Sequence, residues 1–439
     1  MRQQELLIYR VENMEDGGLL KDMTHLLEHC GDTVFTEQER EEYKALFYDC
    51  AHRLLELAGS HGFSGNLWHC YLTNLLVNCE NSYSIACEIR NGTDGSINDA
   101  ALHDISIFKE FFDADFEPLL QTLDAGDCRI LFDYEASRQE SRVYNERICK
   151  RICSLAKEFI NCRNAGEMKV ALTAFYQDYG VGKFGLHKSF RVVHKENGVH
   201  IEPILKIAHV KLSDLVGYEL AKKKLVENTE AFVSGRKSNN CLLFGDAGTG
   251  KSSSIKGIIN EYYDRGLRII EVYKHQFQDL NDVISQIKNR NYKFIIYMDD
   301  LSFEDFEIEY KYLKAVIEGG LEKKPENVLI YATSNRRHLV REKFSDKEER
   351  VDDLHKGDTV SEKLSLVARF GVTIYFGAPD RKLFQEIVLT LAARNHIDLS
   401  EEELLAEANK WELNHGGLSG RTAQQFIDYL AGKAGESAW

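Results

Sequence analysis

The sequence predicts an α/β protein in which a five-stranded parallel sheet and a small helical lid follow a mainly α-helical N-terminal domain. Helical patterns without strand-like runs fill the chain up to about residue 180. Short apolar runs then alternate with helical segments, which is typical of a parallel sheet. After Pro379 the strand-like runs stop and only helical segments follow. We therefore expect three domains, which span residues 1–204, 205–378 and 379–439.

The N-terminal domain has the sequence pattern of amphipathic helices. Thr36 and Glu39 have the spacing of a capping box at the start of a long helical segment. The segment ERICKRICSLAKEF repeats apolar residues at helical spacing, so that one face carries Ile148, Ile152, Leu155 and Phe159. The β-like stretch FRVVHKENGVHIEPIL, with a central turn, predicts the passage to the next domain near residue 205. No motif in this domain indicates its role.

Five strands and three lid helices complete the expected elements. The strands are the apolar runs CLLF (241–244), LRIIEVY (267–273), FIIYM (294–298), VLIYA (328–332) and VTIYF (372–376). Runs of this kind fit strands that are covered on both faces, and open α/β sheets bind their ligands at the carboxyl ends of such strands. The lid helices are expected at about 380–395, 400–411 and 419–432.

Composition and charge exclude several classes of protein. The formal charge of −15 argues against a broadly basic surface for nucleic acid. No apolar run approaches the roughly 18 residues that a membrane span needs, and the start, MRQQELLIYRVENMEDGG, lacks a signal-peptide core. We therefore expect a cytoplasmic protein without a membrane partner. Cys149, Cys153 and Cys162 have no histidines at ligand spacing, so we expect reduced structural thiols rather than a metal site.

A glycine-rich loop follows the first strand of the second domain. GDAGTGKSS matches the pattern GxxxxGK followed by Ser or Thr, and it precedes a helical segment. Its glycines let backbone N–H groups approach phosphate oxygens, and the helix adds the partial positive charge of its N-terminus. Lys251 can span the β- and γ-phosphates, and Ser252 can offer its hydroxyl to Mg²⁺. The expected nucleotide-binding residues are Gly245, Asp246, Ala247, Gly248, Thr249, Gly250, Lys251, Ser252 and Ser253.

Two carboxylates end the strand-like run FIIYM. An isolated pair would most often only end the strand, because Asp favours turns. Beside a phosphate loop, however, Asp299 ends its strand at the edge where it can hold the hydration shell of Mg²⁺, with Ser252 as the other metal-binding residue. Asp300 can then take a proton from the attacking water. Glu304 is a second candidate for this base if the chain turns sharply after Asp300.

With these motifs in place, residues 205–435 resemble the AAA+ ATPases. The resemblance implies a P-loop AAA+ module, with ATP and Mg²⁺ as its ligands. It places Val216, Gly217 and Tyr218, in the segment DLVGYELAKKKL, beside adenine. The segments GDAGTGKSS, MDDLSFE, ATSNRRHL and ARFG together resemble the bacterial ATPases called domain of unknown function 815, a resemblance that supplies no substrate.

Three further residues occupy positions that act in catalysis in the AAA+ family. The resemblance implies sensor 1 at Asn335, in YATSN, and sensor 2 at Arg421, in LSGR. It also implies an arginine finger at Arg369, in SLVARFGVTIYF. Taken alone, each residue has an ordinary structural explanation, as a turn former, a helix C-terminal charge or a surface residue. Their order downstream of the phosphate loop favours the catalytic interpretation.

One departure from the family pattern concerns the second carboxylate. Active AAA+ enzymes usually carry Asp-Glu here, whereas this chain carries Asp299 and Asp300. The missing methylene shortens the reach by about 1.5 Å, one carbon–carbon bond. A misplacement on that scale can cost on the order of a hundredfold in rate. Slow turnover is therefore compatible with the sequence.

Three functional hypotheses follow. The first is an ATP-hydrolysing protein that assembles into a homo-oligomeric ring or partial ring and remodels an unknown protein or nucleic-acid client. The second is a switch that binds ATP tightly and hardly hydrolyses it. The third is a helicase-loader-like protein that engages DNA through Arg336 and Arg337, a hypothesis weakened by the overall acidity. Protein unfolding is less expected, because KHQFQDL lacks the aromatic-hydrophobic-glycine loop of such motors.

Overall fold

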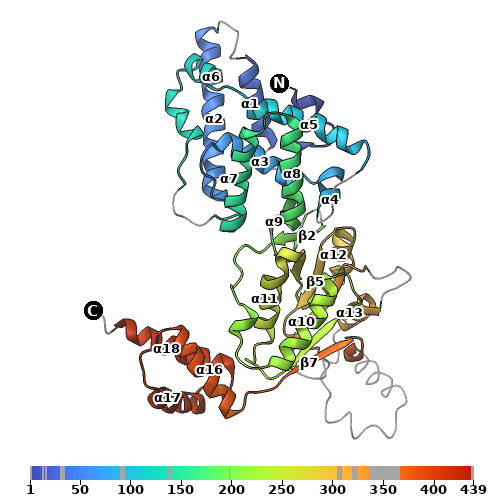
Figure 1. The fold of residues 1–439 in the computed structure, drawn as a ribbon, viewed down its shortest axis with the longest axis vertical. Helices are drawn as coiled ribbons and strands as arrows, with labels where there is room; N and C mark the ends of the chain where they lie inside the picture. The colour runs from blue at the N-terminus through green and yellow to red at the C-terminus, as the bar shows by residue number, and fades with distance from the viewer. Residues whose placement is uncertain are drawn as a thin grey trace. The chain divides into compact units, whose positions relative to one another are not determined.

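The computed structural model describes residues 2–11, 14, 17–29, 35–88, 94–136, 141–196, 198–303, 309–318, 325–335 and 366–436. Its contacts divide the chain into two compact units, Met1–His187 and Lys188–Trp439 (Figure 1). Each unit has its own hydrophobic core. In the part of the chain that is described, no helix combines the length and the apolar character needed to cross a membrane.

The first unit is helical. It consists of α1 (Gly17–His29), α2 (Glu37–His61), α3 (Leu67–Asn78), α4 (Ser82–Cys87), α5 (Ile97–Phe112), α6 (Glu117–Thr122), α7 (Glu146–Asn161), α8 (Ala165–Tyr179) and α9 (Gly182–Leu186), with 3-10 turns at Gln3–Glu5 and Gly126–Phe132. The predicted capping box is present, because the Glu39 amide donates to the Thr36 hydroxyl and the Glu39 carboxylate accepts from the Thr36 amide. The predicted apolar face of α7 is buried.

A buried carboxylate attaches the start of the chain to this helical core. Asp104 in α5 is fully buried and accepts hydrogen bonds of 2.8–3.1 Å from the backbone amides of Leu7, Ile8 and Tyr9. Three amide donors offset much of the cost of burying the carboxylate. The segment before α1 is therefore held against the core by charge-assisted hydrogen bonds.

The second unit contains a seven-stranded sheet in the order β2-β1-β4-β5-β6-β3-β7. The strands are β1 (Ser189–Lys195), β2 (Gly198–Pro203), β3 (Cys241–Gly245), β4 (Leu267–Glu271), β5 (Lys293–Met298), β6 (Val328–Ser334) and β7 (Val372–Phe376). All neighbours run parallel except β1 and β2. The five predicted strands are therefore present.

The hairpin β1–β2 extends this sheet beyond the five expected strands. From the sequence we expected this hairpin to belong to the N-terminal domain, residues 1–204. In the structure, β1 instead pairs in parallel with β4, with Phe190 opposite Ile270. Phe190 and Val192 are buried at this edge. The sheet therefore begins at Ser189, and the boundary between the compact units falls before it, at His187.

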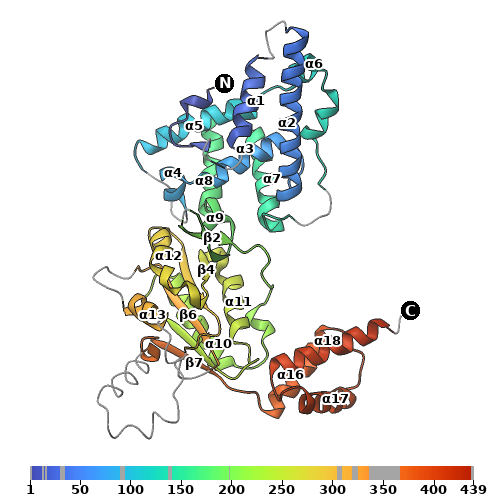
Figure 2. The ribbon, with the colours of Figure 1, turned by 180° about the vertical axis from the view of Figure 1, so that it is seen from behind.

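Helices cover both faces of the sheet. The helices α10 (Glu219–Val233) and α11 (Lys251–Tyr262) share a core with side chains from alternate positions of the strands. On the other face lie α12 (Leu280–Ile287) and α13 (Glu309–Glu318), as Figures 1 and 2 show. Because both faces are covered, strands such as β5 and β6 are apolar throughout and buried.

A helical lid follows β7. It comprises α16 (Arg381–Arg394), α17 (Glu401–Asn414) and α18 (Gly420–Glu436), as predicted. The lid has a core of its own, which includes Phe384, Val388, Leu404, Phe426 and Ile427. Val216, which precedes α10, packs against this core and so links the lid to the sheet domain.

Candidate nucleotide-binding site

The phosphate loop connects β3 to α11 and requires glycine for geometric reasons. Gly245, Gly248 and Gly250 have φ angles of 137°, 73° and 92°. A Cβ atom on Gly245 would lie 2.0 Å from the carbonyl oxygen of Phe376, so no other residue fits there. Gly250 directly precedes α11. The loop thus presents backbone amides at a helix N-terminus, which is the general geometry of a phosphate site.

Lys251 is buried and folded onto the loop. Its side-chain nitrogen donates to the carbonyl oxygens of Gly245, at 3.0 Å, and Asp246, at 2.6 Å. Burial lowers the pKa of Lys251, although the nearby carboxylates of Asp246, Asp300 and Asp299 act in the opposite direction. The Asp246 carboxylate itself accepts from the Ala378 amide at 2.8 Å, which fixes the loop to the start of the lid.

Asp299 receives three hydroxyl hydrogen bonds at one oxygen. Its Oδ1 accepts from Ser252 Oγ at 2.8 Å, Tyr297 OH at 2.7 Å and Thr333 Oγ1 at 2.5 Å. Burial would raise the pKa of Asp299, but these three donors outweigh it and the pKa is lowered. Asp299 is therefore held as a carboxylate beside the Ser252 hydroxyl.

These two residues fit a magnesium ion that is shared with a nucleotide. Mg²⁺ prefers oxygen ligands and usually takes one or two protein donors plus phosphate and water. Ser252 and Asp299 supply that donor set. No group of three or more His, Cys, Asp or Glu side chains in the described ranges is placed to hold a metal, so a site made of protein ligands alone is not found there.

Asp300 lies beside them in an unusual backbone conformation. Its φ angle is 49°, in the left-handed region that Asp tolerates better than most residues. Its amide donates to Thr333 Oγ1 at 2.9 Å, and its Oδ1 accepts from Asn335 Nδ2 at 2.7 Å. Asn335 therefore lies at the end of β6 next to the second carboxylate. Glu304, the other candidate base, lies outside the described residues.

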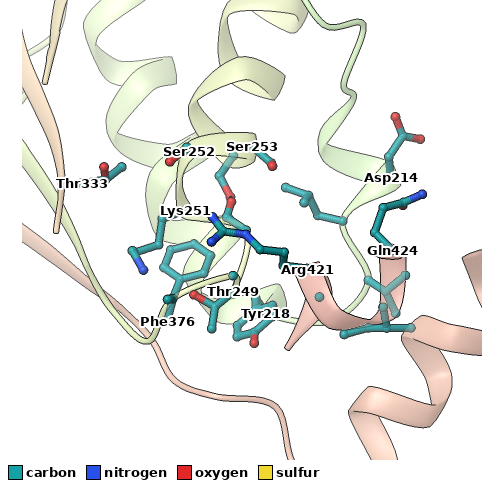
Figure 3. Close-up of a pocket in the computed structure, with 18 of the residues that line it drawn as sticks. Asp214, Tyr218, Thr249, Lys251, Ser252, Ser253, Thr333, Phe376, Arg421 and Gln424 are labelled. Atoms are coloured by element: carbon teal, nitrogen blue, oxygen red, sulfur yellow. The ribbon is translucent and has the colours of Figure 1, made fainter. Parts of the chain in front are cut away.

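A cavity of about 650 Å³ is lined by these groups and by apolar side chains. Its polar wall is formed by the residues from Ala247 to Ser254 with Asp299, Asp300 and Asn335. Its apolar wall is formed by Leu215, Val216, Tyr218, Phe376, Ile387 and Leu391. The ring centroids of Tyr218 and Phe376 are 5.3 Å apart, and Figure 3 labels both side chains among those that line the cavity. The cavity thus combines polar groups that suit phosphates with apolar side chains that suit an aromatic base.

Gly217 supports this wall without lining it. Its φ angle is 76°, and a Cβ atom there would lie 2.5 Å from Leu383 Cδ1 of α16. Tyr218 donates its hydroxyl to the Gly377 carbonyl at 2.9 Å. The segment before α10 is therefore packed between the sheet and the lid, and only Val216 and Tyr218 of the three expected residues face the cavity.

The lid contributes Arg421 to the cavity. Figure 3 shows this side chain extending from the lid towards the phosphate loop. The Arg421 amide donates to the Gly248 carbonyl at 3.3 Å, and Gly248 approaches Arg421 so closely that a Cβ atom there would lie 3.0 Å from the Arg421 Cβ. The loop and the first turn of α18 are thus in direct contact.

Arg369 is placed differently. It lies three residues before the strand β7, is not among the residues that line the cavity, and forms an ion pair with Glu318 at the end of α13. Within a single chain it therefore does not meet the loop. The two arginines Arg336 and Arg337 lie outside the described residues.

Several lining residues were not predicted from the sequence. They are Asp214, Leu215, Lys222, Ser254, Thr333, Phe376, Ile387, Leu391, Gly420, Gln424 and Gln425, and Tyr297 acts on the site through Asp299. A signal existed for some of them. Tyr297 and Thr333 stand two residues before Asp299 and Asn335, a spacing that shares one side of a strand, and Gln424 stands one helical turn after Arg421.

Comparisons with known proteins agree with this description. Residues 186–434 match the family model "Protein of unknown function (DUF815)". The chain belongs to this family. Its phosphate loop, its mostly parallel sheet and its helical lid have the α/β fold that the sequence predicted, and its N-terminal unit is helical as expected.

More distant similarities involve named proteins. Over 81 residues the chain is 35% identical to the replication factor C large subunit of Staphylothermus marinus, which is 18% of either chain. A variant of Thermotoga maritima RuvB is similar over 50% of this chain and 63% of its own, with 16% identity and a TM-score of 0.36. The AAA domain of FIGL-1 in complex with ADP is similar over 53% and 76%, with 17% identity and a TM-score of 0.37. The chain thus spans less than two thirds of the first two relatives.

Proposed function

We propose that this chain binds ATP with Mg²⁺, hydrolyses it, and couples its nucleotide state to the remodelling of a partner. The observation that carries the proposal is the 2.8 Å contact between Ser252 Oγ and Asp299 Oδ1. It joins the end of the phosphate loop to the end of β5, so that two oxygen donors suited to Mg²⁺ meet beside a helix N-terminus. Two oxygen donors beside a phosphate loop and a helix N-terminus are the groups that a nucleotide bound with Mg²⁺ requires.

The chain's own groups would divide the work at the phosphates. The loop amides bind the phosphate oxygens, and Lys251 would exchange its two carbonyl partners for the β- and γ-phosphates. When bound, Mg²⁺ would neutralise charge on the phosphates, held by Ser252 and Asp299. Arg421 would meet the phosphates from the lid, so that nucleotide binding favours lid closure.

The hydrolytic step requires a base and a group that positions water. Asp300 is the candidate base, and Asn335 is the candidate positioning group because its amide contacts the Asp300 carboxylate at 2.7 Å. In this scheme Asp300 accepts a proton from water as the water oxygen attacks the γ-phosphate. The short side chain of Asp300 makes the expected turnover slow.

A nucleotide-gated switch is the second candidate function. The hydrogen bond from Asn335 occupies an oxygen of Asp300, and the left-handed backbone at Asp300 limits how that short side chain can move. Both features favour tight binding with little hydrolysis. A DNA-associated, helicase-loader-like role remains a third hypothesis and rests on Arg336 and Arg337.

Assembly is part of the proposal. Arg369 does not line the cavity formed by the described residues of its own chain, and we assign it as the arginine finger for a neighbouring subunit of a homo-oligomeric ring or partial ring. Its ion pair with Glu318 would have to open or shift for this purpose. The client is an unidentified protein or nucleic acid, and the cytoplasm is the proposed location.

Calorimetric titration of ATP with Mg²⁺ tests the binding half of the proposal. Lys251→Ala should abolish measurable affinity while the protein keeps its fold, since the substitution removes the charge paired to phosphate. Lys256→Ala is the matched control, because Lys256 is an exposed lysine of the same helix that does not line the cavity. Equal affinity in the two variants would refute the assignment of the phosphate loop.

A further inference from the structure

The helical unit contains a cluster of three cysteines that the nucleotide site does not use. Cys70 belongs to α3, and Cys149 and Cys153 belong to α7, which packs against α3. The sulfur atoms of Cys70 and Cys153 are 4.0 Å apart. Cys70 is 2% exposed and Cys149 9% exposed, whereas Cys153 is partly exposed to solvent.

The turn between α2 and α3 encloses this cluster. The Cys149 thiol donates to the Gly62 carbonyl at 2.9 Å, and the Cys70 thiol reaches the Ser64 carbonyl at 3.5 Å. Gly62 has a φ angle of 76°, and a Cβ atom there would lie 3.3 Å from the Cys149 sulfur. The close approach of the turn to the sulfurs therefore depends on glycine. Two of the three thiols are held by backbone carbonyls, and the third, Cys153, is partly exposed.

The surroundings favour the thiolate form at the exposed position. Contacts with the thiols of Cys149 and Cys70 lower the pKa of Cys153, and the Ser64 amide and the Lys157 ammonium, one helical turn further on, act in the same direction, against the opposing effect of burial. The same contacts raise the pKa of Cys70 and of Cys149. The thiolate is the nucleophilic form of cysteine. The sulfur whose pKa is lowered thus lies 4.0 Å from the Cys70 sulfur, whose pKa is raised.

We propose that Cys70 and Cys153 form a peroxide-sensitive pair, in which Cys153 is oxidised first and Cys70 then closes a disulfide between α3 and α7. This modification site is independent of the proposed ATP chemistry. Cys149 is not the partner, because its thiol is directed to the Gly62 carbonyl and it stands in the same helix as Cys153. An S–S bond is about 2.0 Å long, so the two sulfurs must approach by about 2 Å.

The two steps balance with hydrogen peroxide as the oxidant. In the first, the Cys153 thiolate attacks one peroxide oxygen; an S–O bond forms, the O–O bond breaks, and the departing hydroxide takes a proton and leaves as water. The sulfur loses two electrons to the peroxide and becomes a sulfenic acid. In the second, the Cys70 sulfur attacks the sulfenic sulfur; an S–S bond forms, the S–O bond breaks, and the hydroxide leaves as water with the Cys70 proton.

The first experiment uses the reduced, full-length chain. One equivalent of hydrogen peroxide is added, remaining thiols are blocked with N-ethylmaleimide, and peptides are mapped by mass spectrometry. We expect the ten thiols of the chain to fall to eight, with a cross-linked peptide pair that joins Cys70 to Cys153. Ten remaining thiols, or a disulfide that joins any other pair, would overturn the proposal.

A second measurement needs no substitution. Cys162 also lies partly exposed near the end of α7, but burial raises its pKa. At neutral pH an ordinary thiol is only a few per cent thiolate, so iodoacetamide should modify Cys153 on the order of ten times faster than Cys162, after allowance for the lower nucleophilicity of an acidic thiol. Equal rates would contradict the proposed reactivity of Cys153.

Two variants separate the roles of the neighbours. In Cys70→Ser the sulfenic acid at Cys153 has no resolving thiol and should be trapped there by dimedone. In Cys149→Ser the cross-link between Cys70 and Cys153 should still form. If Cys149→Ser forms no disulfide at Cys153, whereas Cys70→Ser forms one with another cysteine, the resolving role belongs to a different cysteine and the pairing is overturned.

Discussion

Tyr297 is expected to stabilise the folded α/β domain through the charge of Asp299. The Tyr297 hydroxyl donates to Asp299 Oδ1 at 2.7 Å, and Tyr297 is 6% exposed. Tyr297→Phe removes this donor with almost no change in shape. Asp299 keeps its hydrogen bonds from Ser252 and Thr333, so the carboxylate loses one of its three hydroxyl donors and retains two.

The magnitude follows from the charge on the acceptor. A hydrogen bond to a charged group contributes about 1.5–3 kcal/mol. Because Asp299 borders an open cavity, solvent screening reduces the contribution of this hydrogen bond. We therefore expect Tyr297→Phe to lower the free energy of unfolding by about 1–2 kcal/mol at pH 7. For a domain of this size, that loss lowers the unfolding temperature by roughly 2–8 °C.

The loss should depend on pH in a specific direction. The pKa of Asp299 is lowered in the folded protein, so the stability it contributes is fully present above the ordinary carboxyl pKa and disappears as the pH falls through the lowered value. Scanning calorimetry tests this pH dependence. The transition of the α/β domain is identified as the one that ATP and Mg²⁺ shift to higher temperature. It is measured at pH 7, at pH 5.5 and in steps below about pH 4. The difference between the wild type and Tyr297→Phe should be constant at the first two values and shrink below them.

Tyr331→Phe is the matched control. Tyr331 is fully buried in the neighbouring strand, and its hydroxyl bonds only neutral groups, Asn228 at 2.9 Å and Thr229 at 3.0 Å. Its cost should therefore not change with pH. If Tyr297→Phe is as stable as the wild type at pH 7, or if its cost is as insensitive to pH as that of Tyr331→Phe, the assigned role of the hydroxyl is wrong.

The remaining predictions concern the nucleotide. Asp299→Ala should remove the Mg²⁺ dependence of ATP affinity, measured by titration with and without a chelator; an unchanged dependence would exclude Asp299 as the metal-binding residue. Arg421→Ala should weaken ATP binding about ten- to a hundredfold, as expected for one charge-assisted contact, and equal affinity would remove the lid from the site. Arg369→Ala should lower turnover by about 10³–10⁵, as for other arginine fingers. Mixed with Lys251→Ala subunits it should regain part of that turnover, and proven mixed oligomers without recovery would refute the finger.

Much of the second unit could be predicted because its signals are local. The phosphate loop, the apolar runs and the lid helices are each encoded within a dozen or so residues, and the structure contains them. The hairpin β1–β2 was recognised as β structure, but its position was not, because the pairing of Phe190 with Ile270 joins segments distant in sequence. Periodicity identifies a strand and does not identify its neighbour.

The same limit applies to the site. Asp299 and Ser252 were brought together by a known motif, and Tyr297 lies two residues before Asp299 on the same side of the strand. The hydroxyl of Thr333, by contrast, reaches Asp299 only through the register of β5 and β6. The partner of Cys153 could not be predicted either, since Cys70 is 83 residues away in the chain. Contacts of this kind depend on tertiary packing, which one sequence does not reveal.

The central claim is tested most directly by the rate of phosphate release from ATP with Mg²⁺, compared between the wild type, Asp300→Asn and Glu304→Gln. We expect slow but measurable release by the wild type and by Glu304→Gln. Asp300→Asn should bind ATP with unchanged affinity and release no phosphate, because the amide cannot accept the proton from water. Undiminished release by Asp300→Asn, with release abolished in Glu304→Gln, would contradict the account and assign the base to Glu304.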